Sequence, residues 1–348
     1  MHDVKPIGRK YVANWLYVVA FLIFAMVILG GLTRLTGSGL SMVDWRPLMG
    51  TIPPLNDADW QSVFEDYQQY PEYQEHNTHM ELSEFKFIFL MEYSHRVLGR
   101  TIGLVFFLPL AFFILRRWLS PPIMRRYLLL FVLGGMQGVV GWFMVKSGLV
   151  DVPRVSQYRL VMHFCMAILV LTLSLWYAFN LSFPSKGNAA PKIWHRAVAL
   201  QALIGLQVVS GGFVAGLKAG FGFNTWPTMN GAWIPRGLMT LEPWYRNFFD
   251  NPVMVQFTHR YLALITAAAV LAFYFRYCSV ATGRMRLGFH FLAGAVVLQV
   301  LLGITTLVMT IPTSLASLHQ GGAMVLWSVM LLVCHQLRPD PEAEKVAD

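Results

Sequence analysis

The chain has 348 residues, of which 56% are hydrophobic and 13% are charged, with a formal net charge of +9 at pH 7. Its mean hydropathy is +0.51. These values exclude a soluble globular domain, a disordered chain and a coiled coil, and they predict an integral membrane protein. About 20 helical residues cross a hydrocarbon core of roughly 30 Å, so the chain has room for about eight crossings.

Eight apolar windows follow one another along the chain. They cover residues 12–32, 87–115, 127–145, 158–181, 197–214, 253–275, 287–309 and 314–334. Continuous apolar runs of this length are typical of membrane-spanning helices, whereas a membrane β-barrel shows short segments of alternating hydrophobicity. We therefore predict an all-α integral membrane protein with eight transmembrane helices.

The basic residues predict the orientation in the membrane. An even number of crossings places both termini on one side, and that side collects more than half of the 27 Lys and Arg residues. By the positive-inside rule this side is cytoplasmic, and the long loops 33–86 and 215–252 face the periplasm. The first ten residues are too short for a cleavable signal and do not resemble a transit peptide, which favours a bacterial inner membrane. The positive charge therefore needs no nucleic-acid partner.

The two halves of the chain repeat each other. VILGGLTRLTGSGLSMVDWRPLMGTIPPL from residue 27 corresponds to VVSGGFVAGLKAGFGFNTWPTMNGAWIP from residue 208. EYSHRVLGR at 92–100 corresponds to QFTHRYLAL at 256–264, and QGVVG at 137–141 corresponds to QVLLG at 299–303. Proline precedes histidine in a fourth pair of segments, near residues 153–163 and 312–319.

Four correspondences in one order predict two pseudo-symmetric four-helix bundles. The N-terminal bundle covers residues 1–182 and includes the long outer loop 33–86, and the C-terminal bundle covers 193–338. A cytoplasmic linker at 183–192 joins them, and a cytoplasmic tail follows at 339–348. Because each half has an even number of helices, both halves should insert in the same orientation.

Four of the ten histidines occupy matching positions in the two halves. They are His95, His163, His259 and His319. Each lies a few residues inside the expected outer end of an even-numbered helix, so we expect one layer of two pairs near the periplasmic side. A polar side chain at this depth is costly without a partner, and two facing imidazoles can hold a heme iron in a bundle core. The alternative is a hydrogen-bonded packing role; zinc is disfavoured because no further ligand lies at suitable spacing.

An arginine follows the first histidine of each pair. Arg96 follows His95 and Arg260 follows His259. A guanidinium at this position could pair with a heme propionate and offset the cost of both charges. The alternative is an arginine whose charged end reaches the membrane interface.

One carboxylate distinguishes the two predicted sites. Of the 18 Asp and Glu residues, Glu92 alone lies inside a predicted span, three positions before His95, and the repeat places Gln256 at the equivalent point. A group that accepts protons or stabilises positive charge suits a macrocycle that is chemically altered. We therefore predict a substrate site in the first half, with Glu92 catalytic, and a cofactor site in the second half. The alternative is that Glu92 only pairs with Arg96 or His95.

Several motifs together resemble a known family. GGLTRLTGSGLSM from residue 30, DWRP from 44, EYSHR from 92, NTWP and NGAWIP from 224 to 235, and LHQGGA from 318 are similar to heme A synthase of the type shared by proteobacteria and mitochondria. The resemblance spans residues 11–337. It implies heme O bound by His95 and His163 as the substrate, and a heme b cofactor bound by His259 and His319. It also implies oxidation of one ring methyl to a formyl group by successive hydroxylations, with water as the expected oxygen source, to make heme A for terminal oxidase assembly.

Partners follow from the same resemblance. The farnesyl-transferring heme O synthase would supply the substrate, while the electron acceptor and the oligomeric state stay open. The acidic segment 57–84 shows no known motif and is expected to be a solvated cap, with a docking surface as the alternative. Two rival functions are a diheme electron-transfer protein and a transporter with parallel repeats, which would be expected to show a polar midplane.

Overall fold

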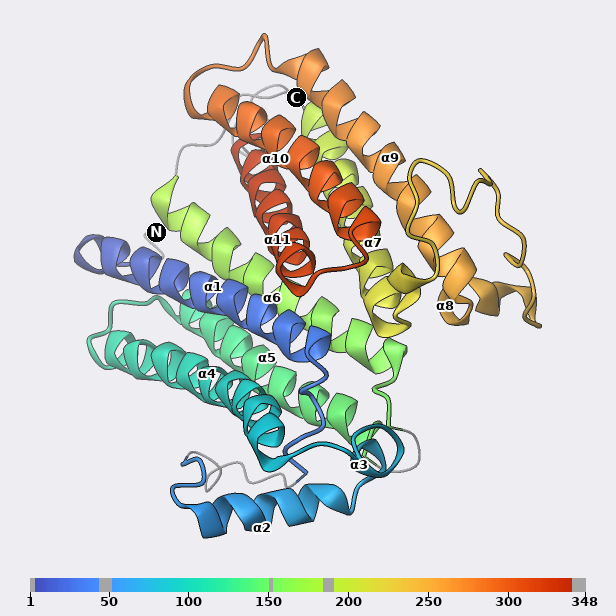
Figure 1. The fold of residues 1–348 in the computed structure, drawn as a ribbon. Helices are drawn as coiled ribbons and strands as arrows, with labels where there is room; N and C mark the ends of the chain where they lie inside the picture. Colours follow the sequence, from blue (N-terminus) through green and yellow to red (C-terminus); the bar gives the residue numbers. More distant parts are fainter. Residues whose placement is uncertain (1–3, 44–51, 150–152, 184–190, 340–348) are drawn as a thin grey trace. The chain divides into compact units, whose positions relative to one another are not determined.

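The computed structural model describes residues 4–43, 52–149, 153–183 and 191–339 (Figure 1). Within these ranges the regular secondary structure is helical, and eight helices are long and apolar enough to cross a membrane. They are α1 (Pro6–Leu35), α4 (Leu82–Leu115), α5 (Pro121–Lys146), α6 (Gln157–Ser182), α7 (Pro191–Gly216), α9 (Pro252–Tyr277), α10 (Gly283–Val308) and α11 (Thr313–Gln336). Each matches one of the eight apolar windows to within a few residues at either end, so the predicted all-α membrane fold is confirmed.

Local sequence explains where several helices begin. Proline occupies the first turn of α1, α5 and α9, where the missing N–H would have had no intrahelical partner. The side chain of Asn251 accepts a hydrogen bond from the Val253 backbone at the start of α9. At the start of α4, Glu81 and Glu84 form a reciprocal capping box.

The chain forms two compact units, Met1–Leu171 and Thr172–Asp348. The division falls inside α6, whereas the repeat places the boundary at residue 182. The physical reason is that the second part of α6 packs on α11: Trp327 donates a hydrogen bond to Thr172 at 2.9 Å, and Asn180 lies 3.0 Å from His335 Nε2. The proposed linker 183–192 and tail 339–348, and the DWRP motif, lie largely or wholly outside the described residues.

In unit 1, α1 packs against α4 and α5 through an aromatic core (Figure 1). The ring of Trp15 lies 4.7 Å from Phe106, 5.5 Å from Phe113 and 5.7 Å from Tyr127, centroid to centroid. Its indole N–H donates to the Val105 carbonyl at 2.9 Å. This core lies toward the end of α4 opposite to His95. The opposite end of unit 1, where α1 ends and α4 begins, is called the histidine end of unit 1. The histidine end of unit 2 is the end where α7 ends and α9 begins.

Helices of the two units have matching limits. When Gln137 is aligned with Gln299, α5 and α10 begin and end at aligned positions and have 26 residues each. When Gly30 is aligned with Gly211, α1 and α7 end at aligned positions. The repeat therefore extends along whole helices, which permits a residue-by-residue comparison of the two units.

The acidic segment 57–84 contains two short helices, α2 (Asp57–Gln68) and α3 (Pro71–His76). They pack on the first turns of α4 through a buried cluster made of Phe64, Tyr67, Phe85, Ile88 and Phe89. We call residues 57–76 the α2–α3 cap. The sequence showed no motif here because the aromatic side chains are spread between acidic and polar residues and meet only after folding.

In unit 2 the segment between α7 and α9 holds only short helices. These are η2 (Ala219–Phe221), η3 (Trp244–Arg246) and α8 (Asn247–Asp250). Asn247 is fully buried and organises this segment, accepting from the Thr240 and Leu241 backbones at 3.0 Å each. The segment therefore has a defined shape at the histidine end of unit 2.

Candidate functional site

Each unit brings two of the predicted histidines together. His95 on α4 and His163 on α6 interact electrostatically in unit 1, and His259 on α9 and His319 on α11 do so in unit 2. All four side chains are partly buried. The two histidines of each predicted pair are therefore near one another, and that each pair binds one iron stays a prediction. That the pairs share one layer stays a prediction.

A glycine on a neighbouring helix lies against each imidazole. A methyl group in place of the glycine hydrogen would lie 2.9–3.1 Å from a ring atom, closer than ordinary van der Waals contact. The four contacts are Gly30 with His95, Gly141 with His163, Gly211 with His259 and Gly303 with His319. Because α1, α5, α7 and α10 supply these glycines and α4, α6, α9 and α11 carry the histidines, all eight long apolar helices take part in placing the rings.

Three of the histidines are also held by a glutamine four residues before that glycine. Gln137 donates to the His163 carbonyl at 3.0 Å, Gln207 to the His259 carbonyl at 3.2 Å, and Gln299 to the His319 carbonyl at 2.9 Å. The amides of Gln207 and Gln299 also lie 3.1 Å from the Nδ1 atom of their histidine. Such contacts fix the orientation of a ligand ring. Gln137 and Gln299 belong to the repeated segments QGVVG and QVLLG, but the sequence predicted no role for them.

His95 lacks this support. The positions of α1 that correspond to Gln207 and Ser210 are Met26 and Leu29, which offer no amide or hydroxyl group. In unit 2 the Ser210 hydroxyl lies 2.8 Å from His259 Nδ1, whereas no hydrogen bond to the His95 ring is found among the described residues. The ring of His95 is thus placed by packing, and that of His259 by packing and hydrogen bonds.

Glu92 is buried, with 3% of its surface exposed, and is surrounded by hydrogen-bond donors. Its Oε2 accepts from the Ser41 backbone at 2.8 Å, the Ser41 hydroxyl at 2.8 Å and the Met42 backbone at 2.9 Å. Its Oε1 accepts from Arg96 at 2.6 Å, and Arg96 also donates to the Met42 carbonyl at 2.8 Å. Glu92 and Arg96 therefore fasten the Gly-rich segment after α1 to α4. The ion pair between Glu92 and Arg96, which is the alternative to a catalytic role for Glu92, is present.

The equivalent residues of unit 2 fasten the equivalent segment without a carboxylate. Gln256 donates to the Phe223 carbonyl at 3.0 Å, and Arg260 donates to the Phe223 and Thr225 carbonyls at 2.5 and 2.8 Å. Arg260 Nε is buried and has no hydrogen-bond partner among the described residues. Both arginines thus bind loop carbonyls, which the sequence did not predict, and their pairing with propionates stays a prediction.

The donor set suits a porphyrin iron. Within the described ranges no three His, Cys, Asp or Glu side chains come together to hold a bare metal ion. Two imidazoles suffice when a macrocycle supplies the remaining ligands. His163 Nδ1 is buried and has no hydrogen-bond partner among the described residues. The Gln299 amide lies 3.1 Å from His319 Nδ1, and if that amide presented its oxygen to an Nδ1–H, the lone pair of Nε2 would be left for a metal.

Fold and site together define a class: a membrane protein with eight spanning helices and two paired-histidine sites fit for heme. A model of the family described as cytochrome oxidase assembly protein matches residues 13–331, and the chain belongs to this family.

Curated relatives cover almost the whole chain. A protein of Nitrosospira multiformis named heme A synthase is 46% identical over 341 residues, covering 97% of this chain and 96% of the relative. A heme A synthase of Nitrosomonas eutropha is 44% identical, covering 96% of this chain and 97% of the relative. The Bos taurus protein named heme A synthase COX15 is 42% identical, covering 96% of this chain and 84% of the relative. The resemblance stated from the sequence is confirmed.

Proposed function

We propose that this chain is a heme A synthase, a membrane oxidoreductase that converts heme O into heme A by oxidising one ring methyl to a formyl group. Its product serves terminal oxidase assembly. The observation that carries the proposal is the difference between two otherwise matched histidine pairs. A buried carboxylate, Glu92, lies one helical turn from His95, while Gln256 lies at the same place beside His259.

The two units have different roles, unit 1 as the substrate site and unit 2 as the cofactor site. In unit 1, His95 and His163 hold the iron of the substrate heme O. In unit 2, His259 and His319 hold a resident heme b, which supplies electron transfer. The hydrogen bonds around His259 and His319 suit a site whose ligands stay in place, because they restrain both ring and backbone.

The chemistry explains the need for a carboxylate. Conversion of a methyl group and one water into a formyl group releases four protons and four electrons. Glu92 accepts protons or stabilises the positive charge that develops on the substrate. Its four donors hold it in one position, and Arg96 balances its charge while the substrate is absent.

Product analysis tests the reaction. The protein is expressed aerobically with a supply of heme O, and the extracted heme is examined for a formyl-bearing product. A heme A synthase forms that product. A diheme electron-transfer protein would bind heme without altering it, and a parallel-repeat transporter would do neither.

The role of Glu92 is tested with a matched control. Glu92→Gln keeps the shape but removes the charge, so we expect heme at both sites and heme A formation reduced by about 100-fold. Ser41→Ala removes one hydrogen bond to the same carboxylate but keeps both backbone donors, so we expect a much smaller loss. Unchanged turnover in Glu92→Gln would disprove the catalytic role. If Ser41→Ala lost as much heme A formation as Glu92→Gln, the effect would come from loosening the Gly-rich segment after α1 and not from loss of a catalytic carboxylate.

The orientation and location belong to the same proposal. Both termini lie in the cytoplasm, the heme sites lie near the periplasmic side, and the membrane is a bacterial inner membrane. The distribution of Lys and Arg over the loops supports this. Heme O synthase supplies the substrate.

A further inference from the structure

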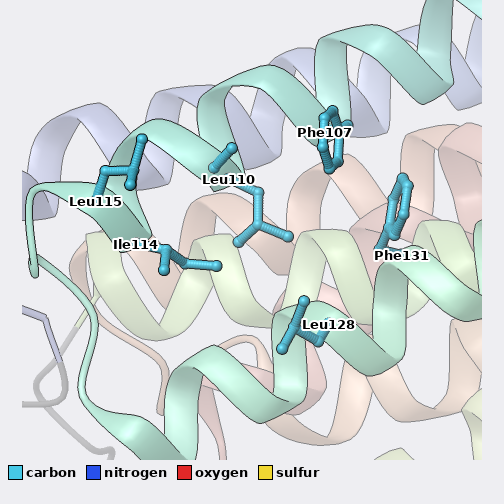
Figure 2. A pocket seen from close by; sticks show the side chains of 7 residues that line it. Phe107, Leu110, Ile114, Leu115, Leu128 and Phe131 are labelled. Carbon is cyan, nitrogen blue, oxygen red and sulfur yellow. The ribbon is translucent and has the colours of Figure 1, made fainter.

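Unit 1 contains an apolar groove between α4 and α5, toward the end opposite to the histidine end (Figure 2). Its volume is about 300 Å³. The lining side chains are all apolar: Phe107, Leu110, Ala111, Ile114 and Leu115 from α4, and Leu128 and Phe131 from α5. Phe107 and Phe131 approach one another across the groove, with ring centroids 5.6 Å apart.

A face of α5 that carries glycines runs from this groove toward the histidine pair. On α5, Gly134 and Gly138 lie between Phe131 and Gly141, on the same side of the helix, and Gly141 contacts His163. A methyl group at Gly134 or Gly138 would have no atom within 4 Å. On α4, Phe107 lies twelve residues beyond His95, roughly 18 Å along the axis at 1.5 Å per residue. The combined length of a porphyrin edge and an extended isoprenoid chain can cover this separation.

Unit 2 fills the equivalent path. The repeat aligns Gly134 and Gly138 with Val296 and Val300 on α10. Val296 is buried, with 3% of its surface exposed. A ligand that extends along this face would collide with valine side chains in unit 2 and meets open space in unit 1.

Unit 2 also closes the equivalent of the groove. The positions of Leu110 and Leu128 correspond to Tyr274 and His290, whose hydroxyl and Nδ1 atoms are 3.0 Å apart. Ile114 corresponds to Cys278, whose sulfur lies 3.9 Å from His290 Nε2. In unit 2, Tyr274, Cys278 and His290 contact one another. In unit 1, the equivalent side chains are apolar and line a groove.

We propose that the groove of unit 1 binds the farnesyl chain of heme O. This inference rests on the proposed function and names the subsite that recognises the substrate. Heme O and heme b differ by that apolar chain. The unit assigned to heme O has the open face and the groove, whereas in the described part of unit 2 valines and three mutually contacting side chains occupy the equivalent positions. Leu128 and Phe107 are 41% and 48% exposed, so the groove opens to the surface of the unit and the chain can enter from the bilayer.

Variants that copy unit 2 into unit 1 test the subsite. The double variant Leu110→Tyr, Leu128→His introduces the side chains of Tyr274 and His290 and should close the groove in the same way. The separate variant Ala111→Phe introduces the side chain of Phe275 at Ala111, which is half-buried and can therefore accept a larger side chain. Leu108→Tyr, on the exposed side of α4, is the matched control. The purified protein with its resident heme is titrated with heme O and with heme B, which lacks the chain, and binding is followed by absorption.

We expect the wild-type protein and Leu108→Tyr to bind heme O more tightly than heme B. The groove variants should bind heme O about tenfold more weakly and heme B unchanged, a moderate effect because lipid is an equally apolar alternative for the chain. An unchanged ratio of the two affinities, as expected if the groove holds only lipid, would overturn the proposal, and so would an equal loss of both. Formyl product is assayed separately: if no heme A forms but the groove variants lose the heme O preference, the reaction is wrong and the subsite stands.

Discussion

At the scale of single residues, the size of the side chain opposite each imidazole decides whether the ring can be placed. Gly141 and Gly303 lie closest, since a methyl group at either would stand 2.9 Å from the Cε1 atom of the facing histidine. A ring that moved away would lose its contact with the glutamine amide, which lies 3.1 Å from His319 Nδ1 and 3.5 Å from His163 Nε2. These two glycines are therefore positioning residues for the ligands.

Replacing Gly303 by alanine should displace His319 from its place in the heme site. We expect affinity for the unit 2 heme to fall about tenfold, or about 1.4 kcal/mol. Heme content per protein, measured from the absorption spectrum after purification, checks this. Gly294→Ala on the same helix is the control, because a methyl group there meets no atom within 4 Å. Equal heme content in both variants would show that the glycine contact is not needed.

A single hydroxyl should set the electronic character of one ligand. The Ser210 hydroxyl donates to the Gln207 carbonyl at 2.7 Å, so it can accept from His259 Nδ1 at 2.8 Å when iron binds Nε2. Ser210→Ala removes this acceptor and makes the imidazole a weaker electron donor, which should raise the midpoint potential of the unit 2 heme. Redox titration measures it. Ser328→Ala, whose hydroxyl bonds only to the Met324 carbonyl, should leave the potential unchanged; a fall in the Ser210 variant would contradict the assignment.

At the scale of elements, the α2–α3 cap is held to α4 by buried aromatic rings and a small polar group. The Tyr67 hydroxyl donates to Glu72 at 3.2 Å and accepts from Asn77 at 2.7 Å. Its ring stacks on Phe85 with centroids 5.1 Å apart. Burial, and then the negative charge of Glu72, raise the pKa of Tyr67 above its ordinary value.

This raised pKa predicts how the α2–α3 cap responds to alkaline pH. The pKa is higher in the folded cap than in the opened cap, so the stabilisation is complete below the ordinary tyrosine pKa of about 10 and is lost as pH rises above it. Hydrogen exchange of residues 57–76 should accelerate above that pH in the wild-type protein. Tyr67→Phe should lose about 1 kcal/mol at neutral pH and show a weaker alkaline response. An identical alkaline response in both proteins would rule out Tyr67 as its source.

At the scale of the whole molecule, the repeat gives the two units histidine pairs with similar surroundings that differ at a few positions. Glu92 and Gln256 differ in charge, Leu29 and Ser210 differ in hydrogen bonding, and Gly134 and Val296 differ in size. A duplicated bundle can thus hold two similar macrocycles and act chemically on one. The two units share α6, whose first part carries His163 and whose second part packs on α11.

The proposed orientation predicts the outcome of reporter fusions. A green fluorescent protein fused after residue 337 should fluoresce, because it stays in the cytoplasm. Alkaline phosphatase fused after residue 79, in the long loop between α1 and α4, should be active, because it folds only in an oxidising periplasm. The reverse pattern would invert the orientation and place both histidine pairs near the cytoplasmic side.

The sequence by itself determined the membrane class, the eight spans, the repeat and the four histidines. These follow from composition, from apolar runs and from the spacing of chemically distinctive residues along the chain, all of which are local or periodic signals. The family followed as well, since its motifs are contiguous. Most helices begin a few residues before their apolar windows, because caps and polar first turns extend a helix beyond its apolar part.

Only the tertiary structure decided which groups surround those histidines. Glu92 meets Ser41 across 51 positions, Gln207 meets His259 across 52, and the groove joins α4 to α5. Glycine and leucine are common in membrane helices, and a membrane glutamine can hydrogen-bond to many different partners, so the sequence does not show which of these residues contact a histidine or line a groove. Their roles arise from which helix faces meet when the units pack, and that depends on the interlocking of many side chains at once rather than on any single segment.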